Sequence, residues 1–304
     1  MNHCASLLLL WLLILQVRAA SAQPVSLHLT IRNVTTKQPL AYATVYSAKM
    51  HTGIYSDESG KIEWTLDASD TITISFLSYE TQKIAVQAIS TAHDILLKEA
   101  TYGLKPLEVK ASKKRNKTYR IGFYDDPTNF DRWGVAIGSV AANFISNNTQ
   151  MSGHLKTLLV DLGKASKQAH RAKARVRIYA AANPTKGPGR DILNENIIFI
   201  IPRFARTQKI DLTPYNIIFS SEGLFIGIEF LGFDTKEGQK NAWNLQTGAN
   251  ITSTKRDDYK SVGSSWRFPD TNDKPRWINL TDGSKHKAWE RTLYKIGAEV
   301  EAVE

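Results

Sequence analysis

Residues 53–81 contain a pair of segments in which apolar and polar side chains alternate, and few folds accommodate such a pair. Apolar side chains recur at every second position, which is typical of half-buried strands: Ile62, Trp64 and Leu66, then Ile72, Ile74 and Phe76. In the polar turn before the first segment, Asp57 can cap free backbone groups and Gly60 can adopt a positive φ. Residues 67–70 form a second polar turn. The pattern predicts two strands joined as a hairpin.

Short alternating runs continue on both sides of this pair, at residues 25–31, 41–45, 84–86 and 95–97. About seven short strands with a turn every roughly eight to twelve residues are typical of a β-sandwich. We therefore predict an all-β fold that begins with a seven-stranded sandwich over residues 23–104. Because this strand set is complete, the segment is expected to fold alone.

The order and spacing of these segments resemble a known family. The matching pieces are residues 29–31, 36–45, 56–61, 70–72 and 75–81. Residues 27–97 resemble the carboxypeptidase-like regulatory domain, a prealbumin-like β-sandwich of secreted proteins and of the N-terminus of TonB-dependent receptors in Gram-negative outer membranes. Members usually carry Gly near Thr30 and at Ser78, where this chain departs. The family domain has no peptidase residues, so the resemblance implies a scaffold and a compartment, and no catalysis.

Residues 1–22 have the features of a cleavable signal peptide. An apolar stretch at residues 7–17 is followed by Ala20 and Ala22 at the two positions that must be small. Cys4, the chain's single cysteine, precedes the apolar stretch, whereas a lipoprotein cysteine would follow it. We expect cleavage after Ala22 and export to the periplasm or cell surface of a Gram-negative bacterium, with no transmembrane segment in the mature chain.

A basic segment separates the first sandwich from the rest of the chain. Residues 110–120 contain six basic side chains and almost no apolar ones, which predicts a linker at residues 105–120. Residues 121–304 are expected to form a second β-rich domain, a sandwich of jelly-roll type. Its apolar or alternating runs lie at residues 155–162, 174–182, 195–201, 217–220 and 224–231. Arg175, Arg177 and Glu229 are expected on the solvated faces of their strands.

Catalytic and metal-binding patterns are weak. The histidines after residue 22 include no pair at i, i+3 or i, i+4, and neither a Gly-x-Ser-x-Gly motif nor a phosphate-binding loop occurs. Paired carboxylates could support glycoside cleavage, with Asp125-Asp126, Asp257-Asp258 and Glu229 as candidates, but adjacent aspartates are common in turns. The basic residues at 164–177 lack interleaved aromatics, which argues against single-strand nucleic acid. We expect no enzyme activity, cofactor, metal or nucleic-acid partner.

Tryptophans in the polar C-terminal part supply the candidate ligand-binding residues, Trp243, Trp266 and Trp277. Each ring either caps an end of the core or stacks on a sugar. The formal net charge of +10 favours an anionic glycan. The leading hypothesis is a non-catalytic secreted envelope protein, in which a scaffold or docking sandwich precedes a domain that binds a protein or glycan. The alternatives are a glycan or peptide hydrolase with its site in the second domain, and a structural subunit of an outer-membrane assembly.

Overall fold

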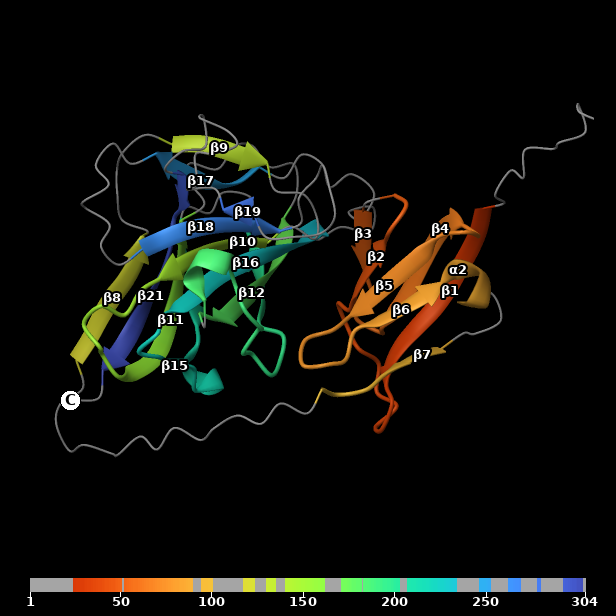
Figure 1. Ribbon diagram of the computed structural model, residues 1–304, viewed down its shortest axis with the longest axis horizontal. Coiled ribbons are helices and arrows are strands. Elements are labelled where there is room, and N and C mark those ends of the chain that lie inside the picture. Colours follow the sequence, from red (N-terminus) through yellow and green to blue (C-terminus); the bar gives the residue numbers. More distant parts are fainter. Residues whose placement is uncertain are drawn as a thin grey trace, which may run out of the picture.

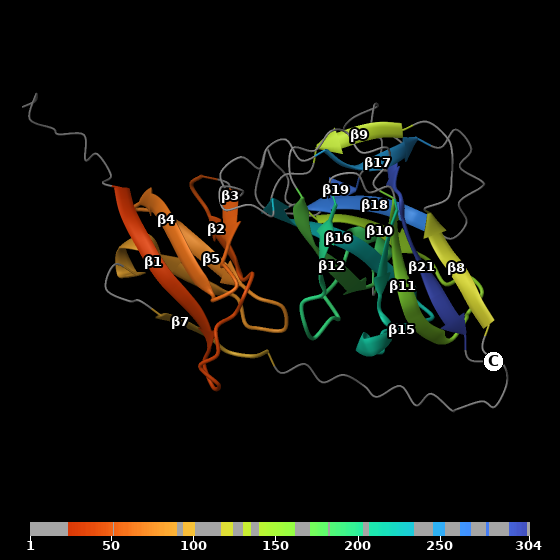
Figure 2. The ribbon, with the colours of Figure 1, turned by 180° about the vertical axis from the view of Figure 1, so that it is seen from behind.

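Two β-sandwiches lie side by side along the longest axis of the computed structural model (Figures 1 and 2). The structure describes residues 24–50, 52–89, 94–100, 117–123, 130–134, 140–161, 171–181, 183–202, 207–233, 246–252, 262–268, 278–279 and 292–302. The predicted all-β class, with one sandwich following another, is confirmed. The predicted signal peptide, residues 1–22, lies outside the described residues.

The first sandwich packs a three-stranded sheet against a four-stranded one. The first sheet has the order β4-β1-β7, with β1 (Pro24–Asn33), β4 (Lys61–Asp67) and β7 (Asp94–Leu97). The second has the order β3-β2-β5-β6, with β2 (Thr44–Ser47), β3 (Thr52–Tyr55), β5 (Thr71–Ser75) and β6 (Gln82–Ala85), followed by the short helix α2 (Val86–Ile89). Alternating side chains from both sheets form one core, which includes Leu27, Leu29, Ile31, Val45, Ile62, Leu66, Ile72 and Ile74.

The two central strands form where the alternation predicts them, but the expected hairpin is wrong. β4 pairs with β1, whereas β5 pairs with β2 and β6 in the opposite sheet. The turn at residues 67–70 therefore crosses between the sheets. Buried Asp70 holds this crossing, because its carboxylate accepts hydrogen bonds from the Ser47 hydroxyl at 2.5 Å and the Lys49 amide at 3.1 Å. Alternation identifies the buried face of a strand but not its neighbour.

The turn before β4 has the predicted chemistry. One carboxylate oxygen of Asp57 accepts hydrogen bonds from the amides of Ser59 and Lys61, each at 2.8 Å. Gly60 has φ +74°, and a Cβ at that position would lie 2.7 Å from the carbonyl oxygen of Ile31. Only glycine fits this close approach without strain.

The second sandwich also consists of two packed sheets. The larger has the order β13-β12-β16-β10-β18-β19, formed by β10 (Val140–Ile145), β12 (Ala172–Ala180), β13 (Ile198–Ile201), β16 (Leu224–Phe233), β18 (Val262–Phe268) and β19 (Ile278–Asn279). The other has the order β14-β11-β21-β8, with β15 paired to β11, formed by β8 (Lys117–Phe123), β11 (Gly153–Asp161), β14 (Thr207–Asp211), β15 (Ile218–Phe219) and β21 (Ile296–Ala302). Side chains such as Leu155, Val176, Ile226 and Val300 fill the core between them.

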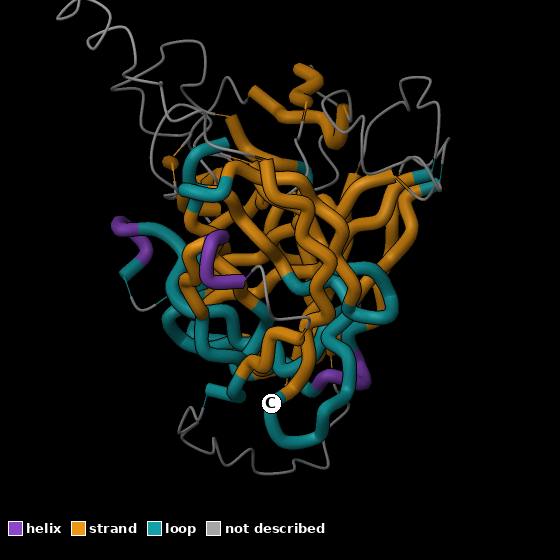
Figure 3. Tube along the Cα trace, turned by 90° about the vertical axis from the view of Figure 1, so that its right-hand side faces the viewer, coloured by secondary structure: helices purple, strands orange, loops and turns teal. Residues whose placement is uncertain are grey.

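Smaller elements complete the second sandwich. A three-stranded sheet has the order β20-β17-β9, with β9 (Phe130–Gly134), β17 (Gln246–Thr252) and β20 (Thr292–Tyr294). Two 3-10 turns, η1 (Pro184–Lys186) and η2 (Thr213–Tyr215), lie in the connections. In Figure 3 the strands occupy the centre of the view, and much of the described loop structure lies around them.

The start of the second sandwich differs from the expected boundary. β8 begins at Lys117, so it includes the last four residues of the linker predicted at 105–120. Its partner is the late strand β21, and the pairing runs from Lys117 opposite Ala302 to Phe123 opposite Ile296. Ile121 is buried between the sheets. The basic composition therefore extends into a strand, because an edge strand can carry charge on its exposed face while it still pairs on one side.

Candidate functional site at the junction of the two sandwiches

The face of β12 and β16 that was expected to be solvated is buried at the junction of the two sandwiches. Arg175 on β12 lies opposite Glu229 on β16 in the strand register. Arg175 is only 1% exposed and Glu229 only 3%. The expected exposure is therefore wrong, because side chains and backbone of the first sandwich contact this face. Polar alternation marked a distinct face of the strands, but this face meets another sandwich and not water.

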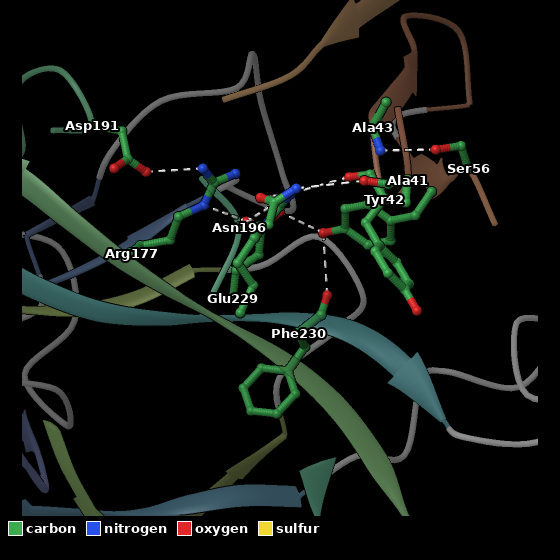
Figure 4. A network of polar contacts seen from close by, with 11 residues as sticks. Ala41, Tyr42, Ala43, Ser56, Arg177, Asp191, Asn196, Glu229 and Phe230 are labelled. Carbon is green, nitrogen blue, oxygen red and sulfur yellow. Dashed lines mark hydrogen bonds and ion pairs between the residues drawn. The ribbon is translucent and has the colours of Figure 1, made fainter. Parts of the chain in front are cut away.

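Glu229 is the centre of this contact. Its Oε2 atom accepts hydrogen bonds from Arg175 Nε at 3.0 Å, from Arg175 Nη2 at 2.8 Å and from Arg177 Nε at 2.5 Å. Its Oε1 atom accepts a hydrogen bond from the hydroxyl of Tyr55, a residue of the first sandwich, at 2.6 Å. We call Tyr55, Arg175, Arg177 and Glu229 the junction network; Figure 4 labels its members Arg177 and Glu229, with Asp191 and Asn196 beside them.

The charges in the junction network decide the protonation of its members. Burial by itself raises the pKa of Glu229, but the positive charges of Arg175 and Arg177 outweigh that effect and lower the pKa to about 2. Burial, and then the neighbouring Glu229 charge, raise the pKa of Tyr55 well above its ordinary value. Glu229 is therefore an anion and Tyr55 a neutral hydrogen-bond donor over the ordinary pH range.

Arg175 also reaches the backbone of the first sandwich. Its Nη1 atom donates to the Tyr42 carbonyl at 3.1 Å and to Asn196 Oδ1 at 2.9 Å. The amide of Asn196 donates in turn to the Ala41 carbonyl at 3.4 Å. The guanidinium carbon of Arg175 lies 5.6 Å from the centroid of the Tyr55 ring. One buried cation thus has partners from both sandwiches.

A more exposed group of contacts lies beside the junction network. The ammonium of Lys173 lies 3.2 Å from the hydroxyl of Tyr42 and 3.3 Å from Glu58 Oε1. The hydroxyl of Tyr42 donates to the same Glu58 oxygen at 3.0 Å. Exposed ion pairs of this kind contribute little energy. Their position across the junction still adds contacts between β12 and the first sandwich.

A second contact between the sandwiches involves residues 77 and 78. Leu77 belongs to the first sandwich in sequence, but it packs within the core cluster of the second. The next residue, Ser78, has φ +64°, and its hydroxyl donates to the Leu193 carbonyl at 3.1 Å. The left-handed backbone explains why the family favours glycine here. Serine accepts some strain at this position, and its hydroxyl provides a hydrogen bond across the junction that glycine lacks.

A cavity of about 340 Å³ opens beside this second contact. Tyr79 and Glu99 line it from the first sandwich, and Asp191 and Asn194 line it from the second. We call it the junction cavity. Asp191 Oδ2 accepts a hydrogen bond from Arg177 Nη1 at 2.9 Å, so the cavity wall is joined to the junction network. Burial raises the pKa of Asp191, and the Arg177 charge opposes that rise.

The predicted ligand-binding tryptophans are placed only in part. Trp266 lies in β18, opposite Ala142 of β10 and Asn279 of β19. Trp243 and Trp277 lie outside the described residues. Their role as ligand-binding residues stays a prediction.

Of the candidate carboxylates, only Glu229 falls in the described part of the chain, and it is engaged in ion pairs. Asp125, Asp126, Asp257 and Asp258 lie outside it. Within the described ranges, no group of three or more His, Cys, Asp or Glu side chains could hold a metal ion. No helix among the described residues is long and apolar enough to cross a membrane.

Sequence reasoning missed Tyr55 of the first sandwich and Asp191 and Asn196 of the second. Tyr55, Asp191 and Asn196 carry no motif, and nothing in the sequence brings them near Arg177 or Glu229. The available signal was the unusual concentration of charge on one face of two predicted strands, with two arginines on one and a glutamate on the other. Such a face requires either water or a polar partner, and the tertiary structure provides the partner.

The fold and the contacts define a β-sandwich module joined through a buried polar junction to a second sandwich. Residues 30–123 match the family model described as the CarboxypepD_reg-like domain. The resemblance found in the sequence is therefore confirmed, and the matched regulatory-like domain is a non-catalytic β-sandwich module. The match continues beyond residue 104 and includes β8, which pairs within the second sandwich. No curated protein matches the chain.

Proposed function

We propose that this chain is a non-catalytic, exported envelope protein of a Gram-negative bacterium, in which the first sandwich supports the second and the second binds a protein or a glycan. The regulatory-like module supports this proposal, because its family is typical of envelope-associated proteins. The observation that carries it is the junction network, in which a charged face of the second sandwich is buried against the first.

The junction network favours a fixed support over a freely moving docking module. Separating the sandwiches would break the hydrogen bond from Tyr55 to Glu229 and the bond from Arg175 to the Tyr42 carbonyl. A hydrogen bond to a charged group contributes about 1.5–3 kcal/mol, so the loss of these two bonds is unfavourable. Buried polar contacts also restrict the geometry, since they are favourable only when every partner is in place. The first sandwich thus presents the second in one orientation.

The same contacts weigh against Glu229 as a hydrolase residue. A general acid for glycoside cleavage needs a carboxyl group with a raised pKa and access to the substrate. The pKa of Glu229 is lowered to about 2, and its two oxygens accept hydrogen bonds from Arg175, Arg177 and Tyr55. The junction network gives no support to the two alternatives, a hydrolase with another site in the second domain and a structural outer-membrane subunit.

Expression of the tagged full-length chain in a Gram-negative host tests both its binding and its location. We expect the mature protein in the envelope fraction, beginning at Gln23, and its retention on insoluble envelope polysaccharide or together with a defined envelope protein. Trp243→Ala, Trp266→Ala and Trp277→Ala are expected to reduce retention while thermal stability stays unchanged. A cytoplasmic protein that retains Met1 would overturn the proposal, as would hydrolysis of glycans or peptides by the purified chain.

A further inference from the structure

We infer that the junction cavity is a binding site for an uncharged saccharide, with one wall from each sandwich. The inference rests on the proposed binding function, and it adds a saccharide site at the junction to the site predicted at the tryptophans. A cavity of about 340 Å³ lies at the lower end of the range for ligand pockets, about 300–1,000 Å³. It is large enough to accept part of a short oligosaccharide and to leave the rest of that chain in solvent.

The first wall presents a fixed carboxylate beside an aromatic ring. Glu99 Oε1 accepts a hydrogen bond from Asn33 Nδ2 at 2.6 Å and lies 3.3 Å from the hydroxyl of Tyr79. Asn33 also donates to that hydroxyl at 2.7 Å. The Tyr79 ring packs edge-on against Phe76, with centroids 5.1 Å apart. These contacts orient both side chains before any ligand arrives, which lowers the entropic cost of binding.

The second oxygen of Glu99 is available to a ligand. Among the residues that the structure describes, Glu99 Oε2 has no hydrogen-bond partner, although the first oxygen has two. Glu99 lines the cavity and is exposed. A carboxylate oxygen in this setting is a strong acceptor for a hydroxyl donor, because hydrogen bonds to an ionised group are about twice as strong as neutral ones.

The second wall adds an amide to a firmly held backbone. Asp191 Oδ1 accepts from the Leu193 amide at 3.1 Å, and the Ile192 amide donates to the Ile178 carbonyl at 2.8 Å. These bonds hold the segment that carries Asn194. Within the described residues the side chain of Asn194 has no hydrogen-bond partner, and it is exposed at the cavity. Its amide can both donate and accept a hydrogen bond.

This combination of groups fits a sugar ring. Neighbouring sugar hydroxyls each donate and accept, so they match a carboxylate acceptor together with an amide that does both. An aromatic side chain offers the apolar face on which the C–H side of a sugar ring can pack. The specific pairing of a few convergent polar groups with an apolar surface is the usual composition of a small-molecule site.

The charges of the cavity favour a neutral saccharide over an anionic one. The charged side chains that line it are Glu99, Asp191 and Arg190, two carboxyl groups against one guanidinium. Arg177 pairs with Asp191 from behind the wall. The remaining lining charges, Glu99 and Arg190, have opposite signs, so the cavity offers an anion no net attraction. The anionic ligand that the net positive charge of the whole chain favours is therefore not expected in the junction cavity.

Titration of the full-length mature protein with oligosaccharides of equal length tests the inference. The probes are cellotetraose, maltotetraose and chitotetraose as neutral ligands and tetragalacturonic acid as the anionic one, with binding followed by saturation-transfer NMR and calorimetry. We expect at least one neutral probe to bind, with its ring protons saturated from the protein. We expect tetragalacturonic acid to bind at least tenfold more weakly.

Two cavity variants and one matched control locate the site. Glu99→Gln keeps an acceptor for Asn33 and Tyr79 but replaces the second oxygen by a donor, and Asn194→Ala removes the amide. Each should weaken binding at least tenfold without a change in melting temperature. Glu80→Gln, on an exposed carboxylate paired with Lys98 at 3.1 Å, should bind as the parent does.

The outcomes distinguish this inference from the proposed function. Binding that is unchanged in Glu99→Gln and Asn194→Ala, but lost in the tryptophan variants, overturns the junction site and leaves a glycan-binding protein. Retention of a defined envelope protein, with no oligosaccharide bound, overturns the saccharide site and leaves the proposed function standing. Stronger binding of the anionic probe contradicts the charge argument and overturns the assignment to a neutral sugar.

Discussion

Replacing Glu229 by Gln tests the junction network with the smallest change of shape. The pKa of Glu229 falls from 4.5 to about 2 in the folded protein. Each pKa unit corresponds to about 1.4 kcal/mol, so the ionised carboxylate stabilises the fold by about 3 kcal/mol relative to its protonated form. Gln resembles that uncharged form, and it leaves Arg175 and Arg177 buried without their shared anion. Glu229→Gln should therefore be about 3 kcal/mol less stable at pH 7, in line with the loss of a buried ion-pair partner.

The pH dependence has a definite sign. Because the pKa is lowered on folding, the stability from Glu229 is fully present above about pH 4.5 and is lost as the pH falls towards 2. Urea unfolding of parent and variant between pH 7 and pH 3 should show the difference in unfolding free energy narrowing below pH 4.5. Glu63→Gln, on a carboxylate that is 83% exposed, should match the parent throughout. A Glu229→Gln protein as stable as the parent at pH 7, or a difference that stays constant down to pH 3, would refute this account.

Three further predictions concern the two sandwiches. Tyr55→Phe removes the hydroxyl donor at 2.6 Å from Glu229 and should cost about 2 kcal/mol in urea unfolding; no loss would mean that water replaces this donor in solution. Trp64 is half-buried against the first core, so Trp64→Ala should lower the free energy of unfolding by about 2 kcal/mol, less than the roughly 3–5 kcal/mol expected for a fully buried ring. Lys61 is exposed, so Lys61→Ala should leave the melting temperature unchanged. Residues 23–104 expressed alone should unfold cooperatively on heating, because their core cluster is separate from that of the second sandwich; a broad, non-cooperative transition would contradict this.

The first sandwich was largely predictable because its information is local. Alternation at Ile62, Leu66 and Ile72 assigns strands and their inner faces, and the Asp57 to Gly60 turn carries its own hydrogen-bonding chemistry. The pairing of those strands was not local. β4 joins β1 although residues 34–60 separate the two strands in sequence, and the choice between sheets depends on how both sheets pack together.

The candidate site shows an even larger difference between what local sequence patterns predict and what depends on contacts between distant residues. Strand periodicity was enough to predict that Arg175, Arg177 and Glu229 lie on polar faces of β-strands, since side chains on a strand alternate between two faces. The burial of this face depends on the docking of the first sandwich, and periodicity could not predict it, because a polar face is equally compatible with water and with a partner of complementary charge. Tyr55 and the Tyr42 carbonyl supply that complement from residues more than one hundred positions away. The junction cavity exists for the same physical reason: its walls come from two sandwiches, and the docking of one on the other brings Glu99 and Asn194 to a common space.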